Sequence, residues 1–343
     1  METQTSAQVP AVSVVVSACN PGPLLRVAIR SALAQTVREI EVIYVDGAST
    51  DGTAVGLGEI ADPRLRVFRQ TRNTGVAGGY NEAIQQARAP WVAIMDADDL
   101  MHPRRLELQL AALAADPTLD FISCDLEMMD AAGVPLGRAE FLHTPEEISR
   151  YAAFNMPVAH PGLVGRRAAF LRVPYREEFR SAPDFDVISR LTEIYRMAAL
   201  PIPLYRWRRH QGSTTFAQPE NGEAYSCMVR IATARRRAGR DERLGELKEL
   251  TAAIVRDRVP RDRFFRRYAA ICAAENFHVL ACLHAALAQR HGGGLPATAR
   301  YVASLGRALV ADPSALRSAL GAVGKAPFWM LLKRAGLPAF PRY

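Results

Sequence analysis

The sequence predicts an α/β fold, in which a mixed, mainly parallel sheet is flanked by helices and followed by a helical C-terminal region. Three observations lead to this prediction. Strand-like and helix-like segments alternate over the first 125 residues, several short runs are almost wholly apolar, and the pattern after residue 219 is helical. Alternating strands and helices favour right-handed crossovers, which build parallel sheets.

The individual elements follow from local patterns. Apolar and β-branched runs predict strands at residues 12–17, 41–45, 65–68, 91–95 and 120–124. Helical spacing of apolar residues predicts helices at residues 23–35, 76–88 and 103–115. Beyond residue 126 the pattern is less regular, and we expect short strands near 163–165 and 204–207 and a helix near 185–196.

The composition is that of an ordinary globular protein, with 49% hydrophobic and 23% charged residues in a chain of 343. Five scattered cysteines form no Cys-x-x-Cys pair, so neither a zinc site nor a disulfide framework is indicated. The first ten residues are polar, and no uninterrupted run of about 18 apolar residues occurs. We therefore expect a flexible N-terminus at residues 1–10 and a cytoplasmic protein.

Positive charge is concentrated in the last third of the chain. Residues 1–220 contain 22 Lys and Arg against 26 Asp and Glu, whereas residues 221–343 contain 21 against 9. Basic clusters lie at residues 235–237, 261–267 and 328–334. A basic helical region, 219–343, suits peripheral contact with the anionic inner face of the plasma membrane, a phosphorylated acceptor, or plain packing with solvated arginines. We expect no nucleic-acid partner, because no binding module is recognisable.

Three carboxylates follow directly on the predicted strand at 91–95. Asp96, Asp98 and Asp99 come where that strand must end, and ligand sites of open α/β sheets lie at the carboxyl ends of strands. Clustered carboxylates repel one another unless a cation lies among them, and hard divalent ions prefer such oxygen ligands. The alternative is an acidic turn in which Asp99 caps the helix that begins near Pro103.

Polar loops follow the other predicted strands at the same edge. The first is Ser17–Pro21, and the second, from Asp46 to Thr53, is rich in glycine and short polar side chains. Such loops let the backbone approach a ligand closely, although Ser49 or Thr50 could also cap a helix. A third segment, from Arg72 to Asn81, is rich in small residues.

In order and spacing, these segments resemble the inverting glycosyltransferases of family 2, which have the GT-A nucleotide-sugar-binding fold. The resemblance spans about residues 12–215. It implies that Asp46 contacts uracil and that Asp96 and Asp98 hold ribose and a divalent metal, Mg²⁺ or Mn²⁺. The donor contacts that it implies are Ser17, Asn20, Asp46, Ser49, Asn73, Gly75, Asn81, Asp96 and Ala97. One departure is Gly47, because the family's usual Asp-Asp-Gly-Ser has a second acid there.

The resemblance continues downstream. The segment around His160 is similar to the family's acceptor side, although the histidine could be an ordinary surface residue in a turn. The run from Pro183 to Asp186 is similar to Glu-Asp-x-Asp, which implies that Asp184 is the catalytic base and that Asp186 lies on the acceptor side; Asp184 could otherwise be a helix cap. In the stretch from Tyr205 to Thr214, the resemblance implies that His210 joins Asp98 as a metal ligand. Nearby arginines, Arg206, Arg208 and Arg209, could face phosphate.

These matches imply a GT-A domain at residues 11–218, with a nucleotide-sugar half at 11–125 and an acceptor half at 126–218. The implied reaction moves a sugar, with inversion, from a UDP-sugar to a hydroxyl of a glycan or lipid-linked acceptor, in cell-envelope or exopolysaccharide synthesis. Alternatives are a non-catalytic scaffold on the same fold and a sugar nucleotidyltransferase, which would favour a Gly-rich basic loop after the first strand. A dehydrogenase is disfavoured, because no Gly-x-Gly-x-x-Gly follows a strand.

Overall fold

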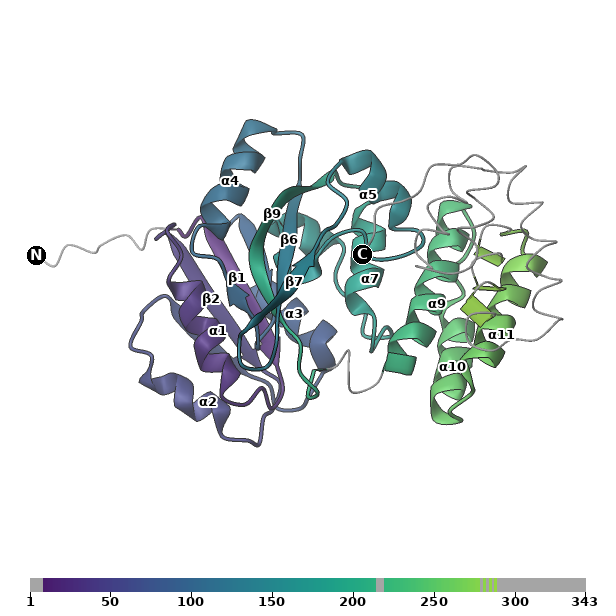
Figure 1. Cartoon of the computed structure of the whole chain (residues 1–343), viewed down its shortest axis with the longest axis horizontal. Coiled ribbons are helices and arrows are strands. Elements are labelled where there is room, and N and C mark those ends of the chain that lie inside the picture. Colours follow the sequence, from purple (N-terminus) through teal and green to yellow (C-terminus); the bar gives the residue numbers. More distant parts are fainter. Residues whose placement is uncertain (1–8, 214–218, 278–279, 282–283, 286, 289–343) are drawn as a thin grey trace, which may run out of the picture. The chain divides into compact units, whose positions relative to one another are not determined.

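The computed structural model describes residues 9–213, 219–277, 280–281, 284–285 and 287–288 (Figure 1). Most of the predicted N-terminal segment and the basic cluster at 328–334 lie outside these residues. The chain divides into two compact units, the first made of residues 1–148 and 157–213 and the second of residues 149–156 and 214–343. None of the helices in the described part combines the length and apolar composition that crossing a membrane requires.

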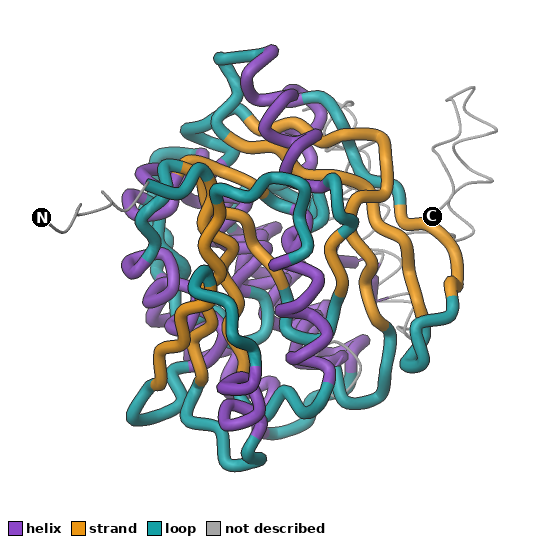
Figure 2. Tube along the Cα trace, turned by 90° about the vertical axis from the view of Figure 1, so that its left-hand side faces the viewer, coloured by secondary structure: helices purple, strands orange, loops and turns teal. Residues whose placement is uncertain are grey.

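A nine-stranded sheet forms the centre of the first unit, with its strands side by side in Figure 2. Its order is β3-β2-β1-β4-β8-β6-β9-β5, and β7 pairs with β6. The strands are β1 Val12–Ala18, β2 Ile40–Asp46, β3 Leu65–Arg69, β4 Trp91–Met95, β5 Leu100–Met101, β6 Phe121–Met129, β7 Pro135–Ala139, β8 Val164–Arg166 and β9 Met197–Arg208. The pairs among β1 to β4 and the pair of β6 with β9 are parallel, and the remaining pairs are antiparallel. The sheet is therefore mixed, as predicted, but only four of its eight strand pairs are parallel, three of them among β1 to β4.

Helices lie on both faces of this sheet, α1 and α4 on one and α3 on the other. The helices up to residue 191 are α1 Leu24–Leu33, α2 Thr53–Gly56, α3 Gly75–Gln86, α4 Arg105–Ala115, α5 Pro145–Tyr151, α6 Arg167–Arg172 and α7 Pro183–Leu191, with short 3₁₀ turns η1 Leu57–Glu59 and η2 His160–Gly162. One apolar cluster joins alternate β1 residues, Val12, Val14 and Val16, to α1 and α4. On the opposite face of β1, Ser17 meets α3 at Gly79, where an added Cβ would overlap the serine. Glycine thus lets α3 lie close to the sheet.

The structure confirms the strands and helices predicted over the first 125 residues, and the strands expected near 163–165 and 204–207 correspond to β8 and to part of β9. It adds the short elements β5 and α2, which were not predicted. The helix expected near 185–196 runs instead over Pro183–Leu191, because the chain must turn before β9 pairs in parallel with β6 from Met197. The sequence pattern did not predict β7, which forms a hairpin with β6. All five residues of β7 are solvent-accessible, so it lacks the apolar alternation by which a strand is recognised.

The second unit is helical, as predicted, over its described residues. Its helices are α9 Pro219–Arg237, α10 Leu244–Arg256 and α11 Arg261–Ala274. Several arginines of the predicted basic clusters pair within this unit: buried Arg235 with Glu275, and Arg236 with Glu242. Arg261 and Arg266 likewise pair with carboxylates. Several of these arginines are therefore neutralised by carboxylates of the same unit. For these residues, this favours a role in packing over contact with a membrane surface.

A fully buried arginine ties α4 to the sheet. The guanidinium of Arg105 donates to the carbonyls of Ile94 on β4, at 3.1 Å, and of Leu163, at 3.2 Å. Its Nε donates to Gln109, whose amide in turn donates to the carbonyl of Gly162 at 2.8 Å. These bonds hold the end of β4 beside the turn that follows His160, so Arg105 fixes two segments that carry predicted site residues.

We expect Arg105→Gln to destabilise the protein by about 2 kcal/mol or more, because it leaves buried carbonyl oxygens without donors. The neighbouring Arg104→Gln is the matched control, since Arg104 is exposed and pairs only with Glu107 at the surface; it should cost less than about 0.5 kcal/mol. Urea unfolding of both variants measures the difference. Equal losses of stability would contradict the role given to Arg105.

Candidate active site

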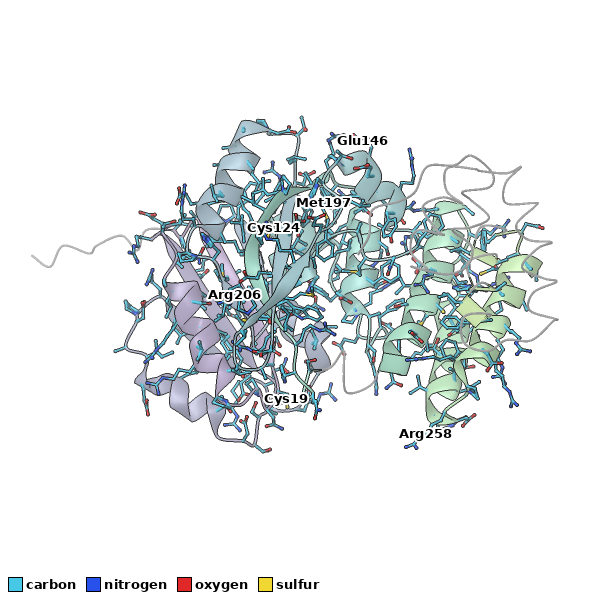
Figure 3. All side chains as sticks on the ribbon, in the orientation of Figure 1. Cys19, Cys124, Glu146, Met197, Arg206 and Arg258 are labelled. Carbon is cyan, nitrogen blue, oxygen red and sulfur yellow. The ribbon has the colours of Figure 1, made fainter. Side chains whose placement is uncertain are left out.

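The parallel strands bring three predicted loops to one edge of the sheet. In the register of β1 with its neighbours, Ala18 pairs with Asp46 on β2, and Val16 pairs with Met95 on β4. The residues that follow each strand therefore emerge together, with Cys19 and the loop after β1 next to the loop after β2 (Figure 3). This edge collects the predicted donor residues from segments far apart in the sequence.

Hydrogen bonds join the loops after β1 and β2 into one body. Asn20 accepts the backbone N–H groups of Thr50, at 2.8 Å, and Asp51, at 3.2 Å. The Ser49 hydroxyl accepts the backbone N–H of Asn20 at 2.8 Å. Ser49 therefore bonds to the neighbouring loop, and α2 begins only at Thr53. The alternative in which Ser49 caps a helix is not supported.

Asp46 is fully buried at the centre of these loops. Its Oδ1 accepts the backbone N–H of Ser49 at 3.0 Å. Among the described residues its Oδ2 has no hydrogen-bond partner, although Arg69 Nε lies 3.5 Å away. A buried carboxylate oxygen without a donor is costly, so a ligand N–H at this position would be stabilising. At Gly47 an added Cβ would lie 3.3 Å from the Ala18 carbonyl oxygen, a tight contact that the missing side chain avoids.

The loop before α3 supplies the next predicted residues. Asn73 Oδ1 accepts the N–H of Gly75 at 2.7 Å, and Gly75 has a positive φ of 74° that favours glycine. Asn81, predicted to contact the donor, is engaged elsewhere. Its amide donates to the carbonyl of Tyr175 and accepts that residue's N–H, both at 2.9 Å. Asn81 therefore holds the Tyr175 segment.

Hydrogen bonds from α3 and β9 hold the acidic turn after β4. Tyr80 of α3 lies with its hydroxyl 2.8 Å from Asp96 Oδ1, and the N–H of Asp96 donates to the Tyr205 hydroxyl at 3.0 Å. Asp99 is buried and accepts the N–H of Arg208 at 2.7 Å. Asp99 does not cap a helix, since α4 begins at Arg105. The cap alternative for Asp99 is therefore wrong.

Burial raises the pKa of Asp96 and raises that of Asp99 well above its ordinary value. The negative charge of Asp98 raises both further. Ala97 lies buried between these acids. The turn thus concentrates negative charge where little solvent reaches it, and a cation beside it would relieve the repulsion.

His210 lies beside this turn, with its Nε2 2.8 Å from Asp98 Oδ2. The two predicted metal ligands are thus neighbours, and their oxygen and imidazole donors suit a divalent ion. Within the described residues, no group of three such side chains could hold a metal alone. A metal here fits only if other groups, such as phosphate oxygens and water, complete its coordination.

The nearby arginines have structural partners. Arg206, labelled in Figure 3, pairs with Glu127 at 2.5 Å. Arg208 is buried, and its guanidinium donates to the carbonyls of Asp98, at 2.8 Å, and Ala131, at 2.9 Å. The suggestion that these two arginines face phosphate is therefore not supported. Arg208 instead braces the acidic turn.

Asp184 lies in the first turn of α7, within the helix, whose N-terminal flanking residue is Ala182. It is half-buried, and its Oδ1 accepts the N–H of Phe185 at 2.8 Å. Burial raises the pKa of this carboxyl, and its charge in turn raises the pKa of Asp96 and of Tyr175. The raised pKa makes this carboxylate a stronger base than an exposed aspartate.

The two predicted acceptor-side residues are both buried. Asp186 is held by Arg176 and Arg190, with 3.0 Å from each Nε to its Oδ2, so its carboxylate anchors α7. His160 lies with its Nε2 2.8 Å from the Tyr175 hydroxyl, and burial lowers its pKa to about 4. The alternative of a surface histidine is wrong.

Four side chains around the site were not predicted: Tyr80, Tyr175, Tyr205 and Arg105. Tyr80 and Tyr205 lie within sequence segments already predicted to form the site, and this position could have pointed to them. No sequence pattern points to Tyr175 or Arg105, because only folding brings them to this region.

Burial lowers the pKa of His160 from its ordinary value of 6.5 to about 4 in the folded protein. Between these two pH values His160 is protonated in the unfolded chain and neutral in the folded chain. Stability therefore falls as the pH drops through this window. We expect wild type to lose about 2 kcal/mol more than His160→Gln between pH 7 and pH 5. Urea unfolding at both pH values measures this, and parallel losses would contradict a buried neutral histidine.

Residues 13–173 match the family model described as glycosyl transferase family 2. The chain is 29% identical over 275 residues to the succinoglycan biosynthesis protein ExoO of Rhizobium meliloti, which covers 76% of this chain and 70% of that protein. It is 26% identical over 211 residues to the hyaluronan synthase of Pasteurella multocida, covering 61% of this chain but only 21% of the synthase.

Solved structures share the fold. The S. aureus protein TarS, residues 1–349 in complex with UDP, superposes with a TM-score of 0.53 at 18% identity, covering 90% of this chain and 82% of TarS. The mannosyltransferase PcManGT of Pyrobaculum calidifontis, in complex with GDP-Man and Mn²⁺, gives 0.52 at 21% identity, covering 91% and 86%. The chain therefore has the GT-A fold, and over residues 13–173 it resembles the family 2 glycosyltransferases.

Proposed function

We propose that this protein is an inverting glycosyltransferase that moves a sugar from a nucleotide-sugar to an acceptor hydroxyl. One observation carries the proposal. Parallel strands bring the buried Asp46, whose Oδ2 lacks a hydrogen-bond partner among the described residues, to the same sheet edge as the acidic turn, where Asp98 and His210 lie 2.8 Å apart. This edge offers an acceptor for a base N–H beside ligands for a metal-bound diphosphate, and Asp184 of α7 is the proposed base.

The donor would occupy the edge formed by the loops after β1, β2 and β4. We propose uridine as the base, read by Asp46, whose free Oδ2 could accept the uracil N–H. Ser17, Asn20, Ser49, Asn73 and Gly75 would line the nucleoside, with Asp96 and Ala97 toward the ribose. The structures of TarS with UDP and UDP-GlcNAc support uridine as the nucleoside. Guanosine is the competing candidate, since PcManGT was solved with GDP-Man.

The reaction follows from the position of Asp184. Its carboxylate would accept the proton of the acceptor hydroxyl while that oxygen bonds to the anomeric carbon, and the bond from that carbon to the diphosphate breaks on the opposite face. One base suffices, because a nucleoside diphosphate leaves without protonation by a protein acid, unlike the leaving group of a glycoside hydrolase. Asp98 and His210 would hold a divalent ion, Mg²⁺ or Mn²⁺, which when bound neutralises diphosphate charge as a Lewis acid.

For the acceptor we propose a glycan or lipid-linked glycan in the synthesis of an envelope or secreted polysaccharide. The relatives support this, since their names concern succinoglycan, hyaluronan and chondroitin. The chain covers 70% of the first relative and about a fifth of the synthases, so the acceptor stays a proposal.

We expect Asp184→Asn to lower transfer from UDP-sugars by about 10²–10⁴-fold while UDP binding stays within a few-fold of wild type, because only proton removal is lost. The exposed Asp257→Asn, which removes only a surface pair with Arg256, is the control and should leave turnover unchanged. UDP release from a panel of UDP-sugars and calorimetric titration with UDP supply the two readouts.

The pH dependence of wild-type turnover gives a second check on the same residue. Asp184 acts as a base only when ionised, so turnover falls as the pH drops through its pKa. Because burial raises that pKa, the midpoint should lie above the ordinary value of 3.8. Normal turnover of Asp184→Asn would show that the base is misassigned, and a wild type that neither binds UDP nor turns over would favour the scaffold alternative.

A further inference from the structure

Three aromatic rings lie between the acidic turn and the segment that leads to α7. Tyr80 stacks on Tyr175 with 5.4 Å between ring centroids and 25° between planes. His160 meets both rings edge-on, at 5.6 Å and 5.7 Å. All three side chains are buried. We refer to Tyr80, His160 and Tyr175 as the aromatic triad.

The triad touches the donor side through Tyr80. Its hydroxyl lies 2.8 Å from Asp96 Oδ1 and 3.0 Å from the carbonyl of Met95. Tyr80 belongs to α3, which also carries Gly75 and lies close to Ser17 through Gly79. The ring is therefore fixed to the same helix that begins at the predicted nucleotide loop.

The triad reaches the acceptor side through Tyr175. Asn81, the neighbour of Tyr80 on α3, bonds both the N–H and the carbonyl of Tyr175. One residue before it, Pro174 accepts a hydrogen bond from Arg190 of α7 at 2.6 Å. One residue after it, Arg176 pairs with Asp186 of α7. The Tyr175 segment thus joins α3 to α7, the helix on which Asp184 stands.

The Tyr175 hydroxyl and the His160 imidazole are hydrogen-bonded, although apolar rings could fill the same space without this bond. His160 Nε2 lies 2.8 Å from the Tyr175 hydroxyl. Buried polar groups cost free energy unless they are hydrogen-bonded, and a phenylalanine would fill nearly the same volume without that cost. The bond fixes the rotation of the imidazole and the tilt of the Tyr175 ring, which gives a directional constraint that apolar contacts lack.

We infer that the aromatic triad is a positioning device, which sets the placement of Asp184 relative to Asp96 and hence of the acceptor hydroxyl relative to the donor sugar. The inference rests on the proposed glycosyl transfer. Tyr80, His160 and Tyr175 are positioning residues in this inference, because they act through the Tyr80–Asp96 hydrogen bond and through the Tyr175 segment that is bonded to α7. Misplacement of a reacting group by about 1 Å can lower the rate about 10²-fold. Small shifts of α7 would therefore lower the kcat of transfer measurably.

The test compares wild type with Tyr175→Phe, which keeps the ring and removes the hydroxyl. Tyr195→Phe is the matched control, because Tyr195 is half-buried against Phe121 in the same unit and lies outside the triad. Three quantities are measured: the Kd of UDP with Mn²⁺, kcat and KM for the UDP-sugar that turns over, and the ratio of transfer to hydrolysis of that donor. Circular dichroism melting verifies folding.

For Tyr175→Phe we expect a Kd for UDP within about threefold of wild type, a transfer kcat at least about tenfold lower, and a smaller loss in hydrolysis, since a water molecule adapts to a displaced base more readily than an acceptor sugar. Tyr195→Phe should match wild type in all three. A general structural role would instead lower UDP binding, transfer and hydrolysis together.

Two results would overturn the inference, and they are distinguishable. An active wild type with an unchanged kcat and an unchanged transfer-to-hydrolysis ratio in Tyr175→Phe would remove the triad's role and leave the proposed function intact. A wild type and a Tyr195→Phe control that neither bind UDP nor turn over any donor would overturn the proposed function and the inference with it.

Discussion

The repulsion among the three carboxylates after β4 is the constraint on which the rest of the site depends. Asp96, Asp98 and Asp99 occupy one short turn, and burial raises the pKa of the first and the last. The fold meets this cost with hydrogen bonds from distant elements. The Tyr80 hydroxyl donates to Asp96 and the Arg208 backbone N–H donates to Asp99, while the Tyr205 hydroxyl accepts the N–H of Asp96. What these donors leave is a surplus of negative charge, which suits a cation carrying a diphosphate.

The same turn explains why residues far apart in the chain must meet. Arg105 holds the end of β4 to the segment after His160, and Arg208 braces the acidic turn from β9. The first half of the sheet, with parallel strands in register, brings the loops after β1, β2 and β4 to one edge. The Tyr175 segment then links α3 to α7. In the proposed reaction this network would align the donor loops with Asp184.

The sequence predicted the strands and helices of the first 125 residues because their apolar periodicity is strong. It also predicted which loops carry the acids, since loops after parallel strands share an edge. The sequence could not predict which side chains hydrogen-bond to one another in the folded protein. Asn81 looked like a ligand contact, yet its amide is engaged with Tyr175; Asp186 looked like an acceptor residue, yet two arginines hold it. The bonds of Asn81 to Tyr175 and of Arg176 to Asp186 join residues 94 and 10 positions apart through tertiary packing, which no local pattern encodes. The strand β7 was missed because it is exposed.

The central claim is that the sheet edge built from the loops after β1, β2 and β4 binds a nucleoside diphosphate with a divalent ion. Calorimetric titration of the protein with UDP and with GDP, each with Mn²⁺ and with EDTA, tests it most directly. The account predicts UDP binding that is stronger with Mn²⁺ than with EDTA, weakened by Asp98→Asn, and stronger than GDP binding. Preference for GDP would contradict the uridine assignment, and no binding of either nucleotide in either condition would contradict the account as a whole.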